Sequence, residues 1–281
     1  MTVGERLRDA QLRAQVANPD ATAWDARLLL SHSLGYRNPL ALDLREELDE
    51  KADGRFEALW AKRLTGVPVQ HLLGEWDFYG RSFSVDSRAF VPRPETEVLL
   101  AAALREAPGA RRVLDAGAGS GILAVSWLLE RPEARAVALE VSLDALAVAR
   151  SNAARHGVLG RLGLVASDWL SGLAPAPFDL ALSNPPYLAL SEEGKLAPTV
   201  RDYDPRRALF AGEHGLEAIQ HLLDALPPYL EPGSPFLFEI GYGQDVRVRS
   251  EILSRRAWRF VRIEPDLEGI PRVAVARLTE A

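Results

Sequence analysis

The sequence predicts an α/β fold with a mostly parallel sheet, preceded by a small bundle of helices. Three observations support this prediction. Apolar residues recur at helical spacing up to about residue 70, strand and helix patterns alternate from residue 111, and no helix separates the last two strand-like segments. The 281 residues are 47% hydrophobic and 26% charged, which is typical of a globular chain with one large and one small domain.

Composition excludes several classes of protein. There is no cysteine, so a disulfide framework, a thiol nucleophile and a thiolate metal site are impossible. No apolar run follows the start, and no stretch approaches the ~18 apolar residues of a membrane helix, so we expect a cytoplasmic protein that is neither secreted nor membrane-spanning. A net charge of −6 argues against a protein that binds nucleic acid through its overall electrostatic field.

The first domain, residues 1–70, is predicted to be helical, with turn residues separating its helices. It carries no glycine-rich loop or carboxylate pair, so its residues suggest no chemistry. Residues 71–92 are expected to form a β-hairpin linker, because glycines punctuate aromatic segments there and residues 83–85 alternate like a strand. The remaining residues, 93–281, form the third predicted domain.

Strands and helices alternate in this last domain, which predicts a parallel sheet with helices on both faces. Strands are predicted at 112–115, 136–140, 162–166, 179–183 and 235–240, and helices at 122–130, 143–156 and 215–226. The final strands, 258–263 and 272–278, are joined by a loop rather than a helix. They are therefore expected to form an antiparallel hairpin at the sheet edge.

The first candidate site is Asp115-Ala-Gly-Ala-Gly-Ser-Gly121, between a strand and a helix. Glycines there permit a sharp turn and close approach of a ligand to the backbone. The spacing departs from the dinucleotide fingerprint and lacks the lysine of a phosphate-binding loop, so a nucleoside without pyrophosphate fits better. A tight turn without a ligand is the alternative. The residues expected to contact a ligand are Gly117, Ala118, Gly119, Ser120 and Gly121.

Acidic residues at the next two strand ends extend this candidate site. Glu140 ends a strand where a carboxylate can accept hydrogen bonds from a ribose diol, although a helix cap or a solvated charge is the alternative. Asp168 can accept from an exocyclic amine, and Trp169 can line a ring pocket. For this pair the alternative is a loop acid beside a core tryptophan.

The most specific signal is Asn184-Pro-Pro-Tyr187, which follows an apolar strand directly. In open α/β sheets, ligands bind beyond the carboxyl ends of strands. Pro185 and Pro186 have no N–H, so the backbone offers carbonyl acceptors without competing donors, while Asn184 adds an acceptor and Tyr187 a flat ring. Such a site suits a planar group that carries an NH2; a plain proline turn is the alternative.

Together these motifs resemble the class I S-adenosylmethionine-dependent methyltransferases that act on amino nitrogens. Further segments resemble the peptide-chain release factor glutamine N5-methyltransferases, the PrmC/HemK family. These segments are 68–74, 78–80, 90–97, 208–210, 212–216, 239–244 and 266–272, so the resemblance covers nearly the whole chain. Two departures are His71, where tyrosine is common in the family, and Asp204, where glutamate is usual.

The resemblance implies a Rossmann-like catalytic domain over 93–281 and a substrate-recognition role for residues 1–70. It implies methyl transfer from S-adenosylmethionine, with S-adenosylhomocysteine as product, to the glutamine amide in the Gly-Gly-Gln motif of release factors. Asn184, Pro185 and Tyr187 are the expected catalytic residues: the first two accept the amide N–H groups, and the tyrosine packs against the amide plane. A base is not required, because a sulfonium methyl is already electrophilic.

The same resemblance assigns Phe90 and Asn184 to the cofactor, and Pro186 and Arg93 to the substrate; for Arg93 a structural ion pair is an equal alternative. We expect a monomer with release factors as partners and no metal, membrane or direct nucleic-acid binding. Two other functions stay open: adenine-N6 methylation of DNA or RNA, with a flipped base on Tyr187, and a non-catalytic nucleoside-binding adaptor. The negative charge argues against the first, and the intact acceptor motif against the second.

Overall fold

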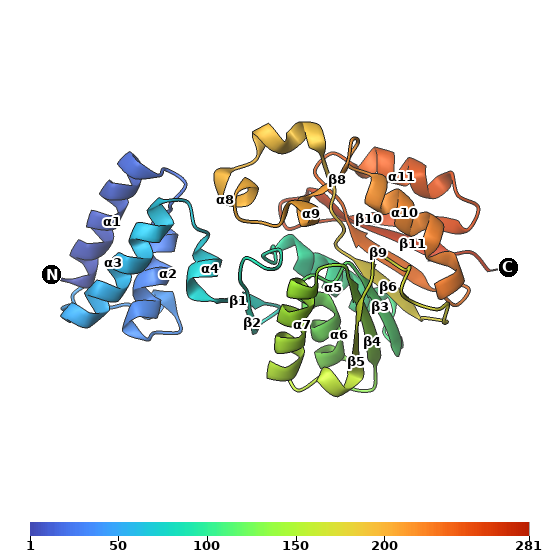
Figure 1. Cartoon of the computed structure of the whole chain (residues 1–281), viewed down its shortest axis with the longest axis horizontal. Helices are drawn as coiled ribbons and strands as arrows, with labels where there is room; N and C mark the ends of the chain where they lie inside the picture. The colour runs from blue at the N-terminus through green and yellow to red at the C-terminus, as the bar shows by residue number, and fades with distance from the viewer. Residues whose placement is uncertain (281) are drawn as a thin grey trace. The chain divides into compact units, whose positions relative to one another are not determined.

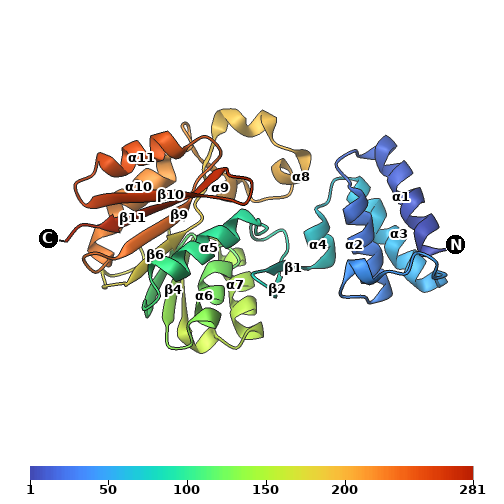
Figure 2. The ribbon, with the colours of Figure 1, turned by 180° about the vertical axis from the view of Figure 1, so that it is seen from behind.

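The computed structural model describes residues 1–280, which divide into two compact units. The helical unit comprises Met1–Trp76 together with Ala197–Tyr203. The sheet unit comprises Asp77–Leu196 and the chain from Asp204 onward. Figures 1 and 2 show the ribbon of both units from opposite sides. No helix within residues 1–280 is long and apolar enough to cross a membrane.

The helical unit consists of short helices around an apolar core, and residues 1–70 are helical as predicted. Its helices are α1 (Val3–Ala17), α2 (Ala23–Leu34), α3 (Glu50–Leu64), α4 (Val69–Leu73), α8 (Pro198–Arg201) and a 3-10 turn (Pro39–Ala41). Thr2 and Thr22 each form a capping box with an acid three residues later, which fixes where α1 and α2 begin. Phe56 and Trp60 stack in the core at 0% exposure.

The segment after residue 70 differs from the expected linker. Helix α4 runs to Leu73, and Gly74 ends it in the left-handed conformation at φ 72°. The hairpin follows, with β1 (Glu75–Phe78) and β2 (Arg81–Ser84). The first residues of the expected linker are therefore helical, because Pro68 begins a helical turn that the glycine spacing alone did not reveal.

The sheet unit contains the predicted, mostly parallel sheet. Its strands are β3 (Arg112–Ala116), β4 (Arg135–Glu140), β5 (Leu162–Ala166), β6 (Leu180–Ser183), β9 (Pro235–Glu239), β10 (Trp258–Pro265) and β11 (Pro271–Leu278). Their order is β10-β11-β9-β6-β3-β4-β5. β11 runs antiparallel to both of its neighbours, whereas the other pairings are parallel, so the predicted C-terminal hairpin at the edge is confirmed.

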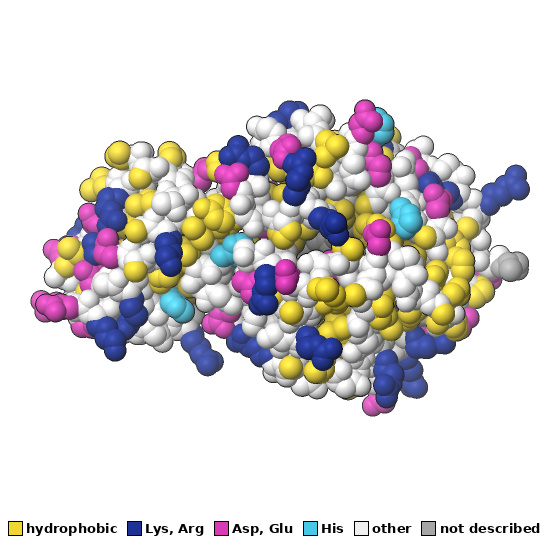
Figure 3. Space-filling model, in the orientation of Figure 1, with side chains coloured by type: hydrophobic (Ala, Val, Ile, Leu, Met, Phe, Trp, Pro, Cys, Tyr) yellow, Lys and Arg dark blue, Asp and Glu magenta, His cyan; other side chains and the backbone are white. Residues whose placement is uncertain are grey.

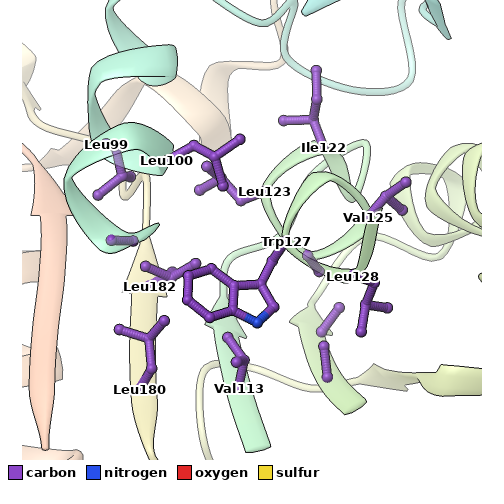
Figure 4. Close-up of a cluster of buried hydrophobic side chains, with 14 of the residues drawn as sticks. Leu99, Leu100, Val113, Ile122, Leu123, Val125, Trp127, Leu128, Leu180 and Leu182 are labelled. Atoms are coloured by element: carbon purple, nitrogen blue, oxygen red, sulfur yellow. The ribbon is translucent and has the colours of Figure 1, made fainter. Parts of the chain in front are cut away.

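Helices cover both faces of this sheet. The helices are α5 (Glu95–Glu106), α6 (Ile122–Glu130), α7 (Leu143–Arg155), α10 (Glu217–Ala225) and α11 (Asp245–Leu253), with 3-10 turns at Leu159–Arg161 and Pro227–Tyr229. On one face, Trp127 of α6 lies among leucines of α5 and β6, as Figure 4 shows. On the other face, α10 and α11 share a second apolar cluster with β9 and β11. Helix α11 was not predicted; only Val248 and Ile252 of it are buried, so its apolar stripe is narrow.

The segment between β6 and α10 folds into short pieces. They are β7 (Leu188–Ala189), a 3-10 helix (Leu190–Lys195), α8, α9 (Arg206–Leu209) and β8 (Phe210–Gly212). β7 pairs with β8 in parallel, so the two ends of this segment are joined beside the residues that follow β6. Pieces this short have no periodicity that a sequence pattern could reveal.

Candidate active site

The strand order brings the predicted motifs to one edge of the sheet. β3 lies between β4 and β6, because the chain builds β4 and β5 on one side and then returns to place β6 on the other. This reversal is a topological switch point, where open α/β sheets bind ligands. The glycine loop follows β3, Glu140 ends β4, residues 168–169 follow β5, and Asn184 follows β6. Parallel strands therefore bring all four motifs to the same side.

The glycine loop is tied to the neighbouring strand by backbone hydrogen bonds. The N–H groups of Gly117 and Ala118 both donate to the Leu139 carbonyl at 2.9 Å. Gly117 and Gly119 have φ angles of 76° and 53°, which favour glycine. A Cβ added at Gly119 would meet no atom within 4 Å, so the backbone there faces open space. A ligand can therefore approach the loop closely at this position.

The other loop residues serve packing. Ala118 and Ser120 are 8% and 4% exposed. Gly121 lies against α7, where an added Cβ would come within 2.8 Å of the Ala149 Cβ. Gly121 therefore allows the close helix packing for which the dinucleotide fingerprint uses a glycine one residue later. Of the five predicted loop contacts, the structure leaves Gly117 and Gly119 accessible and places the other three in the fold.

Glu140 connects the loop to the next helix. Its Oε2 accepts from the Gly119 N–H and its Oε1 from the Ser142 N–H, both at 2.9 Å. The side chain is half-buried, and each carboxylate oxygen keeps a further lone pair. Glu140 therefore positions the loop and keeps acceptor capacity for a diol.

Trp169 lies beside the glycine loop and also packs against the second apolar cluster. Its φ of 50° is unusual for a bulky residue, and such backbone strain is concentrated at functional sites. Atom Cζ3 of its ring would lie 3.4 Å from a Cβ at Gly117, so the half-exposed ring borders the loop. Asp168 is exposed next to it. A flat apolar surface and an exposed carboxylate thus adjoin the loop.

Asn184 is held through Thr96 by Glu239, a residue that was not among the predicted site residues. Its Nδ2 donates to the Thr96 hydroxyl at 3.1 Å, and that hydroxyl donates to Glu239 Oε2 at 2.7 Å. Thr96 lies in the first turn of α5, and Glu239 is the last residue of β9. The Tyr187 hydroxyl is 3.5 Å from Glu239 Oε1. An acid at the end of an apolar strand, like Glu140, was the sequence signal that could have indicated Glu239.

The backbone of Tyr187 is held from a third direction. The Gln244 side chain donates from Nε2 to the Tyr187 carbonyl at 2.8 Å, and its Oε1 accepts from the Gly241 N–H at 2.8 Å. A Cβ at Gly215 would lie 2.7 Å from the Tyr187 carbonyl oxygen, and one at Gly241 would lie 3.0 Å from its ring. Segments 212–216 and 239–244 therefore form a tight support behind the acceptor motif. Pro185 is buried and Pro186 half-buried within the motif.

Burial raises the pKa of three groups in the candidate site. Desolvation raises the pKa of the Glu239 carboxyl to about 7, although the Thr96 hydrogen bond opposes this. Burial, followed by the nearby Glu239 charge, raises the pKa of the Tyr187 hydroxyl. Burial also raises the pKa of the Asp115 carboxyl to about 7. Asp115 is 0% exposed and accepts from the Ala124 N–H at 3.1 Å, so it holds the start of α6.

Arg93 takes the structural role that the sequence left open as an alternative. Its guanidinium pairs with Asp204 at 2.7 Å and lies 5.0 Å from the centre of the half-buried Phe90 ring. Asp204 is 6% exposed, and burial raises the pKa of its carboxyl even though Arg93 opposes the shift. Arg93 and Phe90 are therefore occupied with each other and with the segment before α9. Residues 1–280 contain no group of three or more metal-ligating side chains arranged to hold an ion.

Comparisons with known proteins match the whole chain. Residues 94–198 match the family model of the methyltransferase small domain, and residues 5–74 match that of the PrmC N-terminal domain. The release factor glutamine methyltransferase of Cereibacter sphaeroides is 43% identical over 282 residues, covering 100% of both chains. That of Koribacter versatilis is 37% identical over 281 residues and 99% of each chain. The chain belongs to the release factor glutamine methyltransferase family.

Membership of this family confirms the resemblance drawn from the motifs, and solved structures confirm the fold. A methyltransferase from Pyrococcus furiosus matches with a TM-score of 0.54 at 17% identity, covering 73% of this chain and 91% of that one. The hMettl16 catalytic domain, solved with a MAT2A 3′UTR hairpin, matches with a TM-score of 0.58 at 16% identity, covering 79% and 82%. Both likenesses concern the fold alone.

Proposed function

We propose that this chain transfers a methyl group from S-adenosylmethionine to the side-chain amide N5 of the glutamine in the Gly-Gly-Gln motif of peptide-chain release factors. The observation that carries the proposal is the state of Asn184 at the switch point. Its Nδ2 is engaged by Thr96, while no hydrogen bond from residues 1–280 reaches its Oδ1. A free amide oxygen at the end of β6 is an acceptor for an incoming N–H.

The residues around the glycine loop fit the nucleoside part of the cofactor. Gly119 faces open space, Glu140 has spare acceptor capacity for the ribose hydroxyls, and Trp169 offers a ring surface for adenine beside the exposed Asp168. Gly117 borders that ring. When bound, S-adenosylmethionine supplies a methyl group on a positively charged sulfur, which is electrophilic without further activation.

The acceptor motif supplies orientation. An amide nitrogen is a poor nucleophile because its lone pair is delocalised, so its alignment matters more than its protonation. Asn184 Oδ1 and the Pro185 carbonyl accept the two N–H groups, which aims the nitrogen, and the Tyr187 ring packs against the amide plane with Pro186 beside it. Positioning of this kind can supply much of a rate enhancement. N5 releases one proton after it has gained the methyl group, so no base is needed beforehand.

The two domains divide the work in this proposal. Residues 93–281 hold the cofactor and the acceptor motif, while residues 1–70 recognise the release factor. Large apolar side chains exposed on the helical unit, including Leu12 at 64% and Val16 at 89%, are available for a protein partner. We propose a monomer that acts in the cytoplasm and binds neither membranes nor nucleic acid directly.

The acceptor motif would also suit the exocyclic amine of adenine, but the surface does not favour a nucleic acid. On the face shown in Figure 3, basic and acidic side chains are interspersed rather than gathered into one basic patch. The net charge of −6 also opposes the counterion-release term that dominates nucleic-acid affinity.

The test is methylation with labelled S-adenosylmethionine. A purified, unmodified release factor is incubated with the protein, and peptide mass spectrometry locates the label. Label on the Gly-Gly-Gln glutamine, lost when that glutamine is replaced by alanine in the factor, supports the proposal. Label on DNA or RNA run in parallel, with none on the factor, supports adenine methylation instead. Cofactor binding without transfer to any substrate supports the adaptor.

A further inference from the structure

We infer that Thr96 and Glu239 are positioning residues that fix the orientation of the Asn184 amide, so that its oxygen and not its nitrogen faces the substrate. The inference rests on the proposed role of Asn184 as an acceptor. It concerns the ordered contact Glu239–Thr96–Asn184, whose three members come from β9, α5 and the end of β6.

The orientation of the Asn184 amide follows from which groups in this contact can donate a proton to a hydrogen bond. An ionised carboxylate only accepts, so the Thr96 hydroxyl must use its single proton toward Glu239 Oε2 at 2.7 Å. The hydroxyl oxygen is then left as an acceptor, and only the Nδ2 of Asn184 can donate to it. A flipped amide would place Oδ1 against another acceptor and lose the hydrogen bond.

Water cannot replace the missing partner, because the contact is enclosed. Thr96 and Glu239 are each 2% exposed. Among residues 1–280, no cation forms an ion pair with Glu239; Arg272, whose charge acts on Glu239, pairs with Asp266 at 3.0 Å and lies 3.9 Å from Glu95. An unpaired buried carboxylate is costly to stability. A role in orienting Asn184 accounts for an acid at this place, whereas an apolar residue would pack there at lower cost.

Protonation of Glu239 would remove this control. A neutral carboxyl can donate to Thr96, whose own proton is then free to reach Asn184 Oδ1 and permit the flip. Burial raises the pKa of Glu239 to about 7. The charged and titratable groups that face it are Glu95, Arg272 and Tyr187, of which Glu95 favours the neutral carboxyl and Arg272 the charged one. The methylation rate should therefore rise with pH through the neutral range.

The first test compares Thr96→Val with Thr96→Ser, using release-factor methylation at saturating cofactor. Valine keeps the shape and removes the hydroxyl, so we expect kcat to fall about 10- to 100-fold, while the Kd for S-adenosylmethionine by calorimetry stays within about twofold. Serine keeps the hydroxyl and should retain most of the activity. Thr279→Val is the matched control, because among residues 1–280 that hydroxyl donates only to the backbone carbonyls of Arg256 and Ala257.

The second test uses Glu239, where stability and activity should separate. Glu239→Leu removes a buried carboxylate, so the melting temperature should hold or rise while kcat falls as in Thr96→Val. Glu239→Gln keeps an oxygen that accepts from Thr96, so it should retain more activity than the leucine variant. It should also lose the rise in rate across neutral pH. A merely structural role would lower stability in the leucine variant and leave the pH profile unchanged.

The outcomes separate the two proposals. If the wild type methylates the release factor and Thr96→Val matches it within twofold, the positioning role is wrong and the proposed function stands. If valine and serine lose activity equally, the hydroxyl is not the cause and the inference also fails. If the wild type instead labels adenine, the function is wrong, and the same pair of variants measured on that substrate decides the positioning role. An enzyme that methylates no substrate overturns both.

Discussion

The two halves of the candidate site are held together in different ways. On the cofactor side, backbone N–H groups of the glycine loop donate to the neighbouring strand, at Leu139 and Glu140. On the acceptor side, Asn184 depends on Thr96, which lies 88 residues before it in the sequence. Thr96 in turn depends on Glu239, which lies 143 residues after Thr96. One half is therefore supported by adjacent strands and the other by side chains from distant segments.

This difference has a consequence for variants. Changes in the loop should act on folding and on cofactor affinity, because the same backbone groups support both. Changes in the acceptor half should act on the rate of transfer, because they alter the aim of one side chain without touching the loop. Measuring affinity, rate and stability separately therefore tests whether the halves are independent.

The largest effect should come from Asn184→Ala. Without Oδ1 the target amide loses one of its two acceptors, and we expect kcat to fall about 100- to 1000-fold. The Kd for S-adenosylmethionine should change by less than about threefold, because the loop and Glu140 are untouched. Methylation kinetics and calorimetry measure the two quantities. Unchanged turnover would refute the acceptor role.

Glu140→Ala is the counterpart on the cofactor side. It removes the acceptor for Gly119 and Ser142, together with the proposed acceptor for the ribose. The Kd for S-adenosylmethionine should rise about 10- to 100-fold, with kcat at saturation close to the wild-type value. If this variant instead lowers kcat alone, the two halves are not independent.

A smaller effect separates two glycines of the loop. Gly121→Ala would place a Cβ 2.8 Å from Ala149 at a positive φ, so we expect the free energy of unfolding to fall by about 2–4 kcal/mol. Gly119→Ala meets no atom within 4 Å and should cost only the strain of its positive φ, about 1–2 kcal/mol, while weakening cofactor binding. Urea unfolding and calorimetry distinguish them. Equal losses of stability would contradict the packing role of Gly121.

The smallest effect is a dependence of stability on pH. Burial raises the pKa of the Asp115 and Glu239 carboxyls to about 7 in the folded chain. Between their ordinary values and about 7 the folded protein holds protons that the unfolded chain releases, so the free energy of unfolding falls as pH rises through this window. From pH 5 to 8 we therefore expect the free energy of unfolding to fall, most steeply below about pH 7. Urea titrations at several pH values measure it, and Glu239→Gln should have a shallower slope.

Much of the architecture was predictable because the local periodicity of apolar residues indicates it. Helix α6 and strand β5 have the predicted bounds, and the remaining predicted strands and helices begin and end within a few residues of those observed. Their apolar residues face a buried sheet, so the pattern and the packing agree. Helix α11 and the pieces between β6 and α10 were missed, because a narrow stripe or a run of four residues has too little periodicity.

The candidate site likewise has features that the local sequence predicts and features that only the tertiary structure shows. That the glycine loop, Glu140 and Asn184 lie at one edge of the sheet was predictable from the sequence, because each stands at the end of a strand and the ends of parallel strands converge. The packing of Gly121 on α7, the pairing of Arg93 with Asp204 and the contact of Asn184 with Thr96 and Glu239 could not be found this way. These depend on which strands and helices become neighbours, and that choice is made by burial of the whole sheet rather than by any local run of residues.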